Sequence, residues 1–142
     1  MEWFTKGDEV NTSLFQIIFL DGSKSEYSAD DLNYNTTNQI FTHLSENKDN
    51  IFFISIEHAN ENDLYVEFGK GCCFISMPDE EKAEAYSYLN PHGDKQKYID
   101  FIANCYPQNM LCYHINDLLR IIKTFISTGK PDNSFQWGTT AM

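Results

Sequence analysis

The sequence predicts a single α+β domain over residues 1–142, with a largely antiparallel β-sheet of about six or seven strands packed by two helices. Apolar residues recur at helical spacing between residues 115 and 126, and three short runs between residues 51 and 77 have strand character. Aromatic residues make up 15% of the chain, which favours a folded, sheet-rich protein. A chain of this length can bury a core without disulfides or metal.

The first part of the chain predicts a hairpin followed by a helix. An apolar run over residues 14–20 ends at the turn signal Asp21-Gly22-Ser23, and a polar return strand follows over residues 24–27. Apolar spacing then indicates a first helix, most securely over residues 37–45. Residues 33–38 are poor helix formers, so the start of this helix is left open.

The middle of the chain predicts an antiparallel meander. Runs over residues 51–58, 64–68 and 72–77 are rich in β-branched and aromatic residues and are separated by short polar connections. In the middle run, Tyr65 and Glu67 alternate with apolar residues, so we expect one wet face and one buried face.

Four later segments complete the predicted sheet. Residues 79–84 are a charged turn or short helix, and residues 85–89 are a strand or the end of a helix. Residues 98–103 and 110–113 are expected to be late strands around the turn that contains Pro107.

The segment from Ile115 to Trp137 has the most consistent pattern in the chain. Its apolar residues lie on one helical face, opposite polar ones, as in an amphipathic helix packed on a core. Gly129 and Pro131 form a stop signal. We expect Phe135 and Trp137 to pack under or beside the helix, which makes this segment a scaffold and not the working surface.

The charge of the chain is unevenly distributed. Its formal net charge is -11, and residues 1–100 contain nineteen of the twenty-one acids but seven of the ten bases. Such acidity disfavours direct binding to nucleic acid or to anionic membranes, and it favours a basic partner. A solvated surface that keeps the protein in solution is the ordinary alternative. With no signal peptide or long apolar run, the expected location is cytoplasmic.

The cysteines and histidines raise the alternative of a small cytoplasmic enzyme with a Cys/His site. Cys105, Cys112 and His114 come closest to a cluster, but their spacing is not that of a zinc site. The adjacent Cys72 and Cys73 suit reduced thiols better than disulfides. Nucleotide-binding loops and serine-hydrolase motifs are missing from the sequence. We therefore predict no catalytic, cofactor-binding or metal-binding residue.

The end of the chain resembles a known family. A helix that ends in phenylalanine, a turn with threonine and glycine, a proline and a closing tryptophan are similar to the C-terminal signature of the first-numbered immunity family of bacterial polymorphic toxin systems. The residues in these roles are Phe125, Thr128, Gly129, Pro131 and Trp137. The layout of residues 28–137 is similar to that family as well.

The resemblance implies an immunity protein that binds a cognate toxin domain and blocks its active site, with deaminase-type toxins as the expected partners. A toxin that acts on nucleic acid needs a basic substrate groove, which an acidic surface can occupy. Tyrosines beside carboxylates suit such an interface. The candidate contacts are acids and tyrosines expected to be exposed: Glu57, Glu61, Asp63, Glu67, Asp79, Glu80, Glu81, Glu84, Tyr86 and Tyr88.

Overall fold

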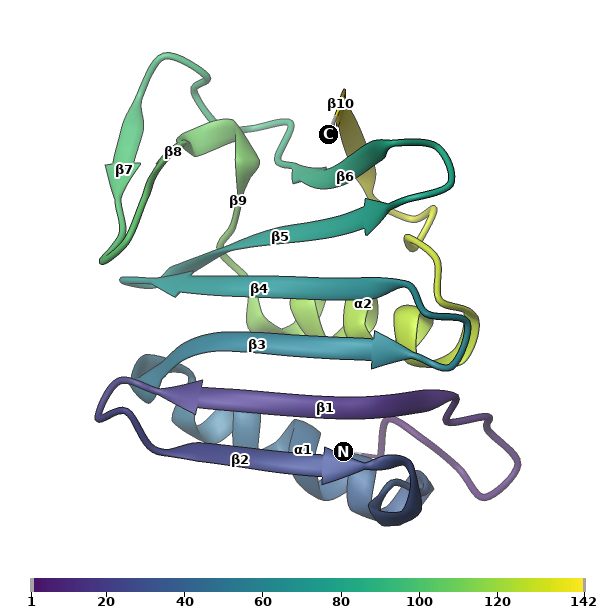
Figure 1. Ribbon diagram of the computed structural model, residues 1–142. Coiled ribbons are helices and arrows are strands. Elements are labelled where there is room, and N and C mark those ends of the chain that lie inside the picture. Colours follow the sequence, from purple (N-terminus) through teal and green to yellow (C-terminus); the bar gives the residue numbers. More distant parts are fainter. Residues whose placement is uncertain (1, 142) are drawn as a thin grey trace.

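A computed structural model describes residues 2–141 as one large antiparallel sheet with two helices on the same face (Figure 1). Eight strands form the sheet, in the order β10-β6-β5-β4-β3-β1-β2, with β9 paired to β5. A separate two-stranded hairpin is formed by β7 and β8. The predicted α+β class and the two helices are confirmed, while the described residues contain more strands than the six or seven predicted.

The strands follow the predicted runs closely over the first two thirds of the chain. The predicted hairpin and meander are present, and the segment after the charged turn is a strand, one of the two alternatives left open. The bounds are β1 Thr12–Phe19, β2 Lys24–Ser28, β3 Ile51–His58, β4 Asp63–Gly69, β5 Cys72–Asp79, β6 Glu84–Leu89, β7 Tyr98–Asp100, β8 Cys105–Pro107, β9 Leu111–Cys112 and β10 Gln136–Ala141.

The first helix, α1, spans Tyr34–Asn47 and begins before the securely predicted range. Asn33 caps it, because its side chain accepts a hydrogen bond from the backbone nitrogen of Thr36 at 2.9 Å. Asparagine destabilises the interior of a helix but is a favourable N-cap residue. The helix buries Ile40, Phe41 and Leu44 against the sheet.

The second helix, α2, spans Ile115–Thr128, as its pattern predicts. Its apolar face is buried, and Phe125 is fully inaccessible to solvent. His114 stands at the N-cap without a side-chain hydrogen bond to the first turn. Gly129 ends the helix in the left-handed conformation, with φ 71°, and its N–H donates to the carbonyl oxygen of Phe125.

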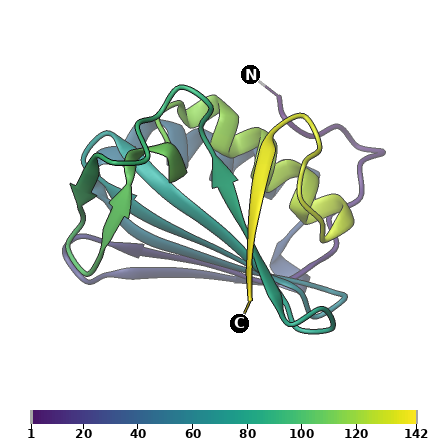
Figure 2. The same cartoon turned by 90° about the horizontal axis from the view of Figure 1, so that it is seen from above.

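Both helices lie on one side of the sheet, and the core fills the space between (Figure 2). Alternate residues of each strand point toward the helices, as period-two alternation requires. Ile54 and Ile56 of β3, with Leu64 and Val66 of β4, are completely buried in this layer. We call the other side of the sheet, which carries no helix, the open face.

The open face is not wet throughout, which corrects the prediction for Glu67. This residue does point away from the helices, but only 7% of it is exposed. The β7–β8 hairpin folds over it, and Asn104 Nδ2 and the hydroxyl of Tyr106 donate to Glu67 Oε1 at 2.8 and 2.6 Å. The carboxylate is therefore part of the attachment of the hairpin.

The last strand, β10, was not predicted from the sequence. It pairs with β6, and Trp137 lies opposite Tyr88. The Trp137 ring meets the Tyr88 ring edge-on at 6.1 Å. Phe135 and Trp137 do return to the core, as expected, but Trp137 does so as a strand residue.

Among residues 2–141, no helix is both long and apolar enough to cross a bilayer.

Candidate functional site

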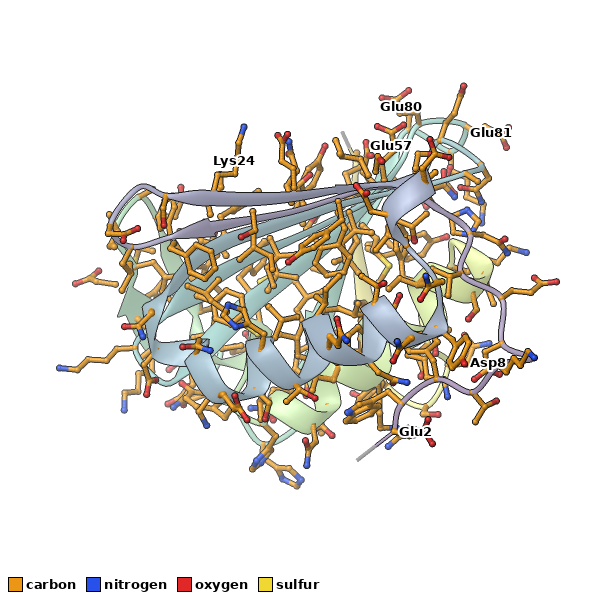
Figure 3. All side chains as sticks on the ribbon, turned by 90° about the horizontal axis from the view of Figure 1, so that it is seen from below. Glu2, Asp8, Lys24, Glu57, Glu80 and Glu81 are labelled. Atoms are coloured by element: carbon orange, nitrogen blue, oxygen red, sulfur yellow. The ribbon has the colours of Figure 1, made fainter. Side chains whose placement is uncertain are left out.

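Because the strands are antiparallel, the two acidic turns lie at the same end of the sheet. The β3–β4 turn and the β5–β6 turn lie at the same end of the sheet as the last turn of α2 (Figure 1). Figure 3 shows Glu57, Glu80 and Glu81 together at this end, with Lys24 toward the other. We call this surface the acidic edge, which consists of Glu57, Glu61, Asp63, Asp79, Glu80, Glu81 and Glu84.

A groove runs beside the acidic edge. It encloses about 1530 Å³ of space between protein atoms, part of it open to solvent. Its walls come from the two acidic turns, from β5, β6 and β10, and from the end of α2 with the connection after it. The residues that line it are Asn60, Asn62, Asp63, Met77, Pro78, Asp79, Glu81, Lys82, Tyr86, Phe125, Gly129, Lys130, Pro131, Asn133 and Trp137.

The groove combines two sets of residues that the sequence analysis kept apart. Four predicted contacts line it, namely Asp63, Asp79, Glu81 and Tyr86. Four residues of the C-terminal signature line it as well: Phe125, Gly129, Pro131 and Trp137. The signature residues therefore lie beside four of the predicted contacts, while their role as scaffold stays a prediction.

Gly129 fixes the β3–β4 turn against the end of α2. The Asn62 carboxamide donates to the carbonyl oxygen of Gly129 at 3.1 Å. A Cβ on Gly129 would collide with the Asn60 carboxamide and would lie 2.9 Å from Nδ1 of His58. A glycine is thus needed here both for its positive φ and for this close approach.

The connection after α2 is held by its own hydrogen bonds. Trp137 Nε1 donates to the carbonyl oxygen of Asp132 at 2.9 Å, and the Asp132 carboxylate accepts from the Thr124 hydroxyl at 2.8 Å. The Thr128 hydroxyl donates to the carbonyl oxygen of Thr124 and accepts from the backbone nitrogen of Lys130. Thr128 therefore shapes the turn that walls the groove.

The carboxylates of the acidic edge form no close ion pair with a base in the part of the chain that the structure describes. The ion pair found within residues 2–141 joins Lys24 to Glu26, away from this edge. Asp63 instead accepts a hydrogen bond from the Tyr65 hydroxyl at 3.3 Å. Burial, together with the nearby Asp63 carboxylate, raises the pKa of Tyr65.

Lys82 is the one base within the β5–β6 turn, and its ammonium does not pair with a carboxylate. Its Nζ donates to the hydroxyl of Tyr86 at 3.0 Å and lies 5.8 Å from the centre of the Tyr86 ring. The hydrogen bond with Tyr86 raises the pKa of Lys82. The sequence analysis described residues 79–84 as a charged turn but did not include Lys82 among the candidate contacts.

Two of the predicted contacts lie inside the protein. Tyr88 is 7% exposed, because it points from β6 toward the helices and packs against Phe135 and Trp137. Burial raises its pKa to about 12. Glu67 lies under the β7–β8 hairpin, as described above. Neither side chain can touch a partner unless the fold opens.

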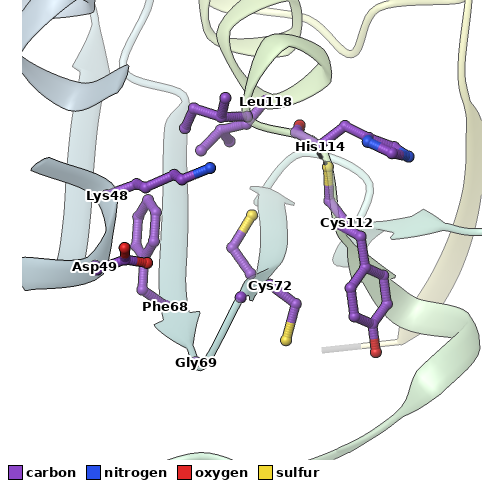
Figure 4. A pocket seen from close by; sticks show the side chains of 12 residues that line it. Lys48, Asp49, Phe68, Gly69, Cys72, Cys112, His114 and Leu118 are labelled. Atoms are coloured by element: carbon purple, nitrogen blue, oxygen red, sulfur yellow. Dashed lines mark hydrogen bonds between the residues drawn. The ribbon is translucent and has the colours of Figure 1, made fainter. Parts of the chain in front are cut away.

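Three of the four cysteines, Cys72, Cys73 and Cys112, line a small crevice away from the acidic edge (Figure 4). Cys73 and Cys112 are directly opposite each other on β5 and β9. Cys112 Sγ donates to the carbonyl oxygen of His114 at 3.4 Å, while the His114 ring points away from the sulfur (Figure 4). Hydrogen bonding with Cys73 lowers the pKa of Cys112, yet this residue is only 2% exposed.

The third member of the predicted Cys/His cluster lies apart from the other two. Cys105 is an exposed residue of the β7–β8 hairpin. Partial loss of hydration and a hydrogen bond with Asp100 raise its pKa. A nucleophilic cysteine needs the opposite shift. Within residues 2–141, no three histidine, cysteine or acidic side chains are arranged to hold a metal ion.

Comparisons with known proteins add information about the fold only. No family model matches the chain, and no curated protein gives a significant match. One solved structure is similar, the crystal structure of a hypothetical protein from Neisseria gonorrhoeae, with a TM-score of 0.62 and 18% sequence identity. The match covers 92% of this chain and 98% of that one, so the whole domain has a counterpart in a known architecture.

Proposed function

We propose that this chain is an immunity protein, a binding protein that neutralises the toxin domain encoded beside it. The acidic edge occupies the basic substrate groove of that domain and blocks its active site. The observation that carries the proposal is the gathering, at one end of the sheet, of seven carboxylates that form no ion pair with a base among residues 2–141.

The clustering of acids at the acidic edge favours binding to a basic surface, whereas solubility would not require the acids to be clustered. Carboxylates from two different turns and the adjoining strand ends lie close together at one end of the sheet, so their fields add and accelerate association with a basic surface. The same fields repel nucleic acid and anionic lipid, which makes direct binding of either unfavourable. A toxin that acts on nucleic acid must present the complementary charge in its substrate groove.

The resemblance of the C-terminal signature to the immunity family supports the same proposal. The five signature residues shape the end of α2 and the wall of the groove. The alternative of an enzyme with a Cys/His site gains no such support, since the His114 ring turns away from Cys112 and Cys105 lies on another element. We also propose a cytoplasmic location, where such a toxin would act.

Mixing the purified chain with the domain encoded by the gene immediately upstream tests this proposal. We expect a stoichiometric complex at low salt, weaker binding as salt is added, and loss of toxin activity in the complex. If no complex forms at low salt, the proposal is wrong.

A further inference from the structure

The groove beside the acidic edge is lined in part by aromatic and apolar residues. Tyr86 and Trp137 come from neighbouring strands and point to the same side of the sheet, and Met77 lies directly across from Tyr86. Asp63, Asp79 and Glu81 line the groove as well. A run of acids alone is ordinary solvated surface, but here three acids share a groove with the aromatic residues Tyr86 and Trp137.

Two lysines of the protein itself, Lys82 and Lys130, already line the groove. The ammonium of Lys82 donates a hydrogen bond to the Tyr86 hydroxyl and lies at the hydroxyl end of that ring, 5.8 Å from its centre, although carboxylates line the same groove. No carboxylate comes within ion-pair distance of Lys82 in the described part of the chain. The position beside the Tyr86 hydroxyl thus holds a positive charge in the free protein.

We infer that the groove binds an arginine or lysine side chain of the partner, and that Lys82 occupies part of this position in the free protein and is displaced on binding. The inference deepens the proposed function and rests on it for the identity of the partner. The binding of a cationic side chain by the groove can be measured independently.

An arginine side chain fits the groove well in chemical terms. A planar guanidinium stacks on an aromatic face and keeps its N–H groups free for carboxylates beside the ring. Tyr86 and Trp137 offer such faces, and Asp63, Asp79 and Glu81 offer the acceptors. Lysine would gain the ring interaction with fewer directed hydrogen bonds.

The test is an NMR titration of the full chain with the short peptide acetyl-Gly-Arg-Gly-amide, followed at the Trp137 indole N–H and at the backbone amides of residues 79–86. The peptide acetyl-Gly-Gln-Gly-amide serves as the neutral control. The variant Lys82→Met removes the cation beside Tyr86, leaves Lys130 in place and keeps a side chain of similar length. Lys70→Met is the matched control, because it changes the net charge equally in the exposed β4–β5 turn, outside the groove.

We expect the arginine peptide, and not the glutamine peptide, to shift the groove signals. We expect the Lys82→Met variant to bind the arginine peptide about threefold more tightly than the Lys70→Met variant does. Equal shifts with both peptides, or equal affinities of the two variants, would overturn the inference. These outcomes are separate from those for the proposed function. A toxin complex that forms while the peptide fails to bind leaves immunity in place and removes the cation site.

Discussion

The hydroxyl of Tyr106 donates a hydrogen bond to Oε1 of Glu67 at 2.6 Å, and so joins the β7–β8 hairpin to the middle of the sheet. The Tyr106 ring also stacks on Phe74, with ring centres 4.0 Å apart and planes 8° from parallel. Phe101 meets the same tyrosine edge-on. One tyrosine therefore anchors the hairpin both by packing and by a bond to a buried carboxylate.

Replacing Tyr106 by phenylalanine keeps the stacking and removes the hydroxyl. We expect the free energy of unfolding to fall by about 1 to 3 kcal/mol, because a buried carboxylate loses a hydrogen-bond donor. Urea denaturation measures this change. Tyr98→Phe, at a side chain that is 61% exposed on the same hairpin, is the control and should change stability little. Equal effects of the two substitutions would contradict the role assigned to the Tyr106 hydroxyl.

The same tyrosine makes stability sensitive to alkaline pH. Burial and the bond to Glu67 raise the pKa of Tyr106, and burial raises that of Tyr88 to about 12, whereas tyrosines in the unfolded chain ionise near about pH 10. Above that pH the unfolded state binds fewer protons than the folded state, so the free energy of unfolding falls as pH rises. Below about pH 10 this contribution is fully present.

Denaturation at pH 8 and at pH 11 tests this pH dependence, and the Tyr106→Phe variant should lose less stability between the two values than the wild type. An identical loss in both proteins would show that Tyr106 ionises normally in the folded state.

Gly129 offers a separate test of how the groove is built. Gly129→Ala places a side chain at φ 71° and drives its Cβ into Asn60 and His58. The matched control is Gly71→Ala, at φ 77° with no atom within 4 Å of the new Cβ. We expect the first to cost about 2 kcal/mol or more and the second about 1 kcal/mol, by thermal or urea unfolding. Equal costs would mean that contact with Asn60 and His58 does not hold the turn.

Local patterns in the sequence were sufficient to predict most of the helices and strands. The spacing of apolar residues and the Gly129 stop signal define α2, and alternation defines the strands of the meander. The sequence analysis did not predict β10, because an edge strand with exposed Thr139 and Thr140 has no alternating apolar pattern. Asn33 and the residues after it were read as poor helix formers, although Asn33 acts as a cap.

The site could be predicted in part only, because its assembly depends on contacts between distant segments. The exposed acids of the β3–β4 and β5–β6 turns come together because the strands are antiparallel. Glu67 was assigned to the correct face, but the hairpin that covers it lies 37 to 39 residues further along the chain. The short run around Tyr88 was ambiguous between strand and helix, so its burial could not be inferred.

The central claim is that the acidic edge binds the toxin domain, and a comparison of two charge reversals tests it most directly. The variant Glu80→Lys/Glu81→Lys reverses two exposed charges of the β5–β6 turn. Glu46→Lys/Asp49→Lys makes the same change in net charge near the start of β3, at the opposite end of that strand from the acidic edge.

Titration calorimetry against the domain encoded by the upstream gene, at about 0.1 M salt, measures both dissociation constants. We predict that the first variant binds at least about tenfold more weakly than the second, because lysines facing a basic groove replace attraction with repulsion. Equal dissociation constants for the two variants would contradict the assignment of the acidic edge as the binding surface.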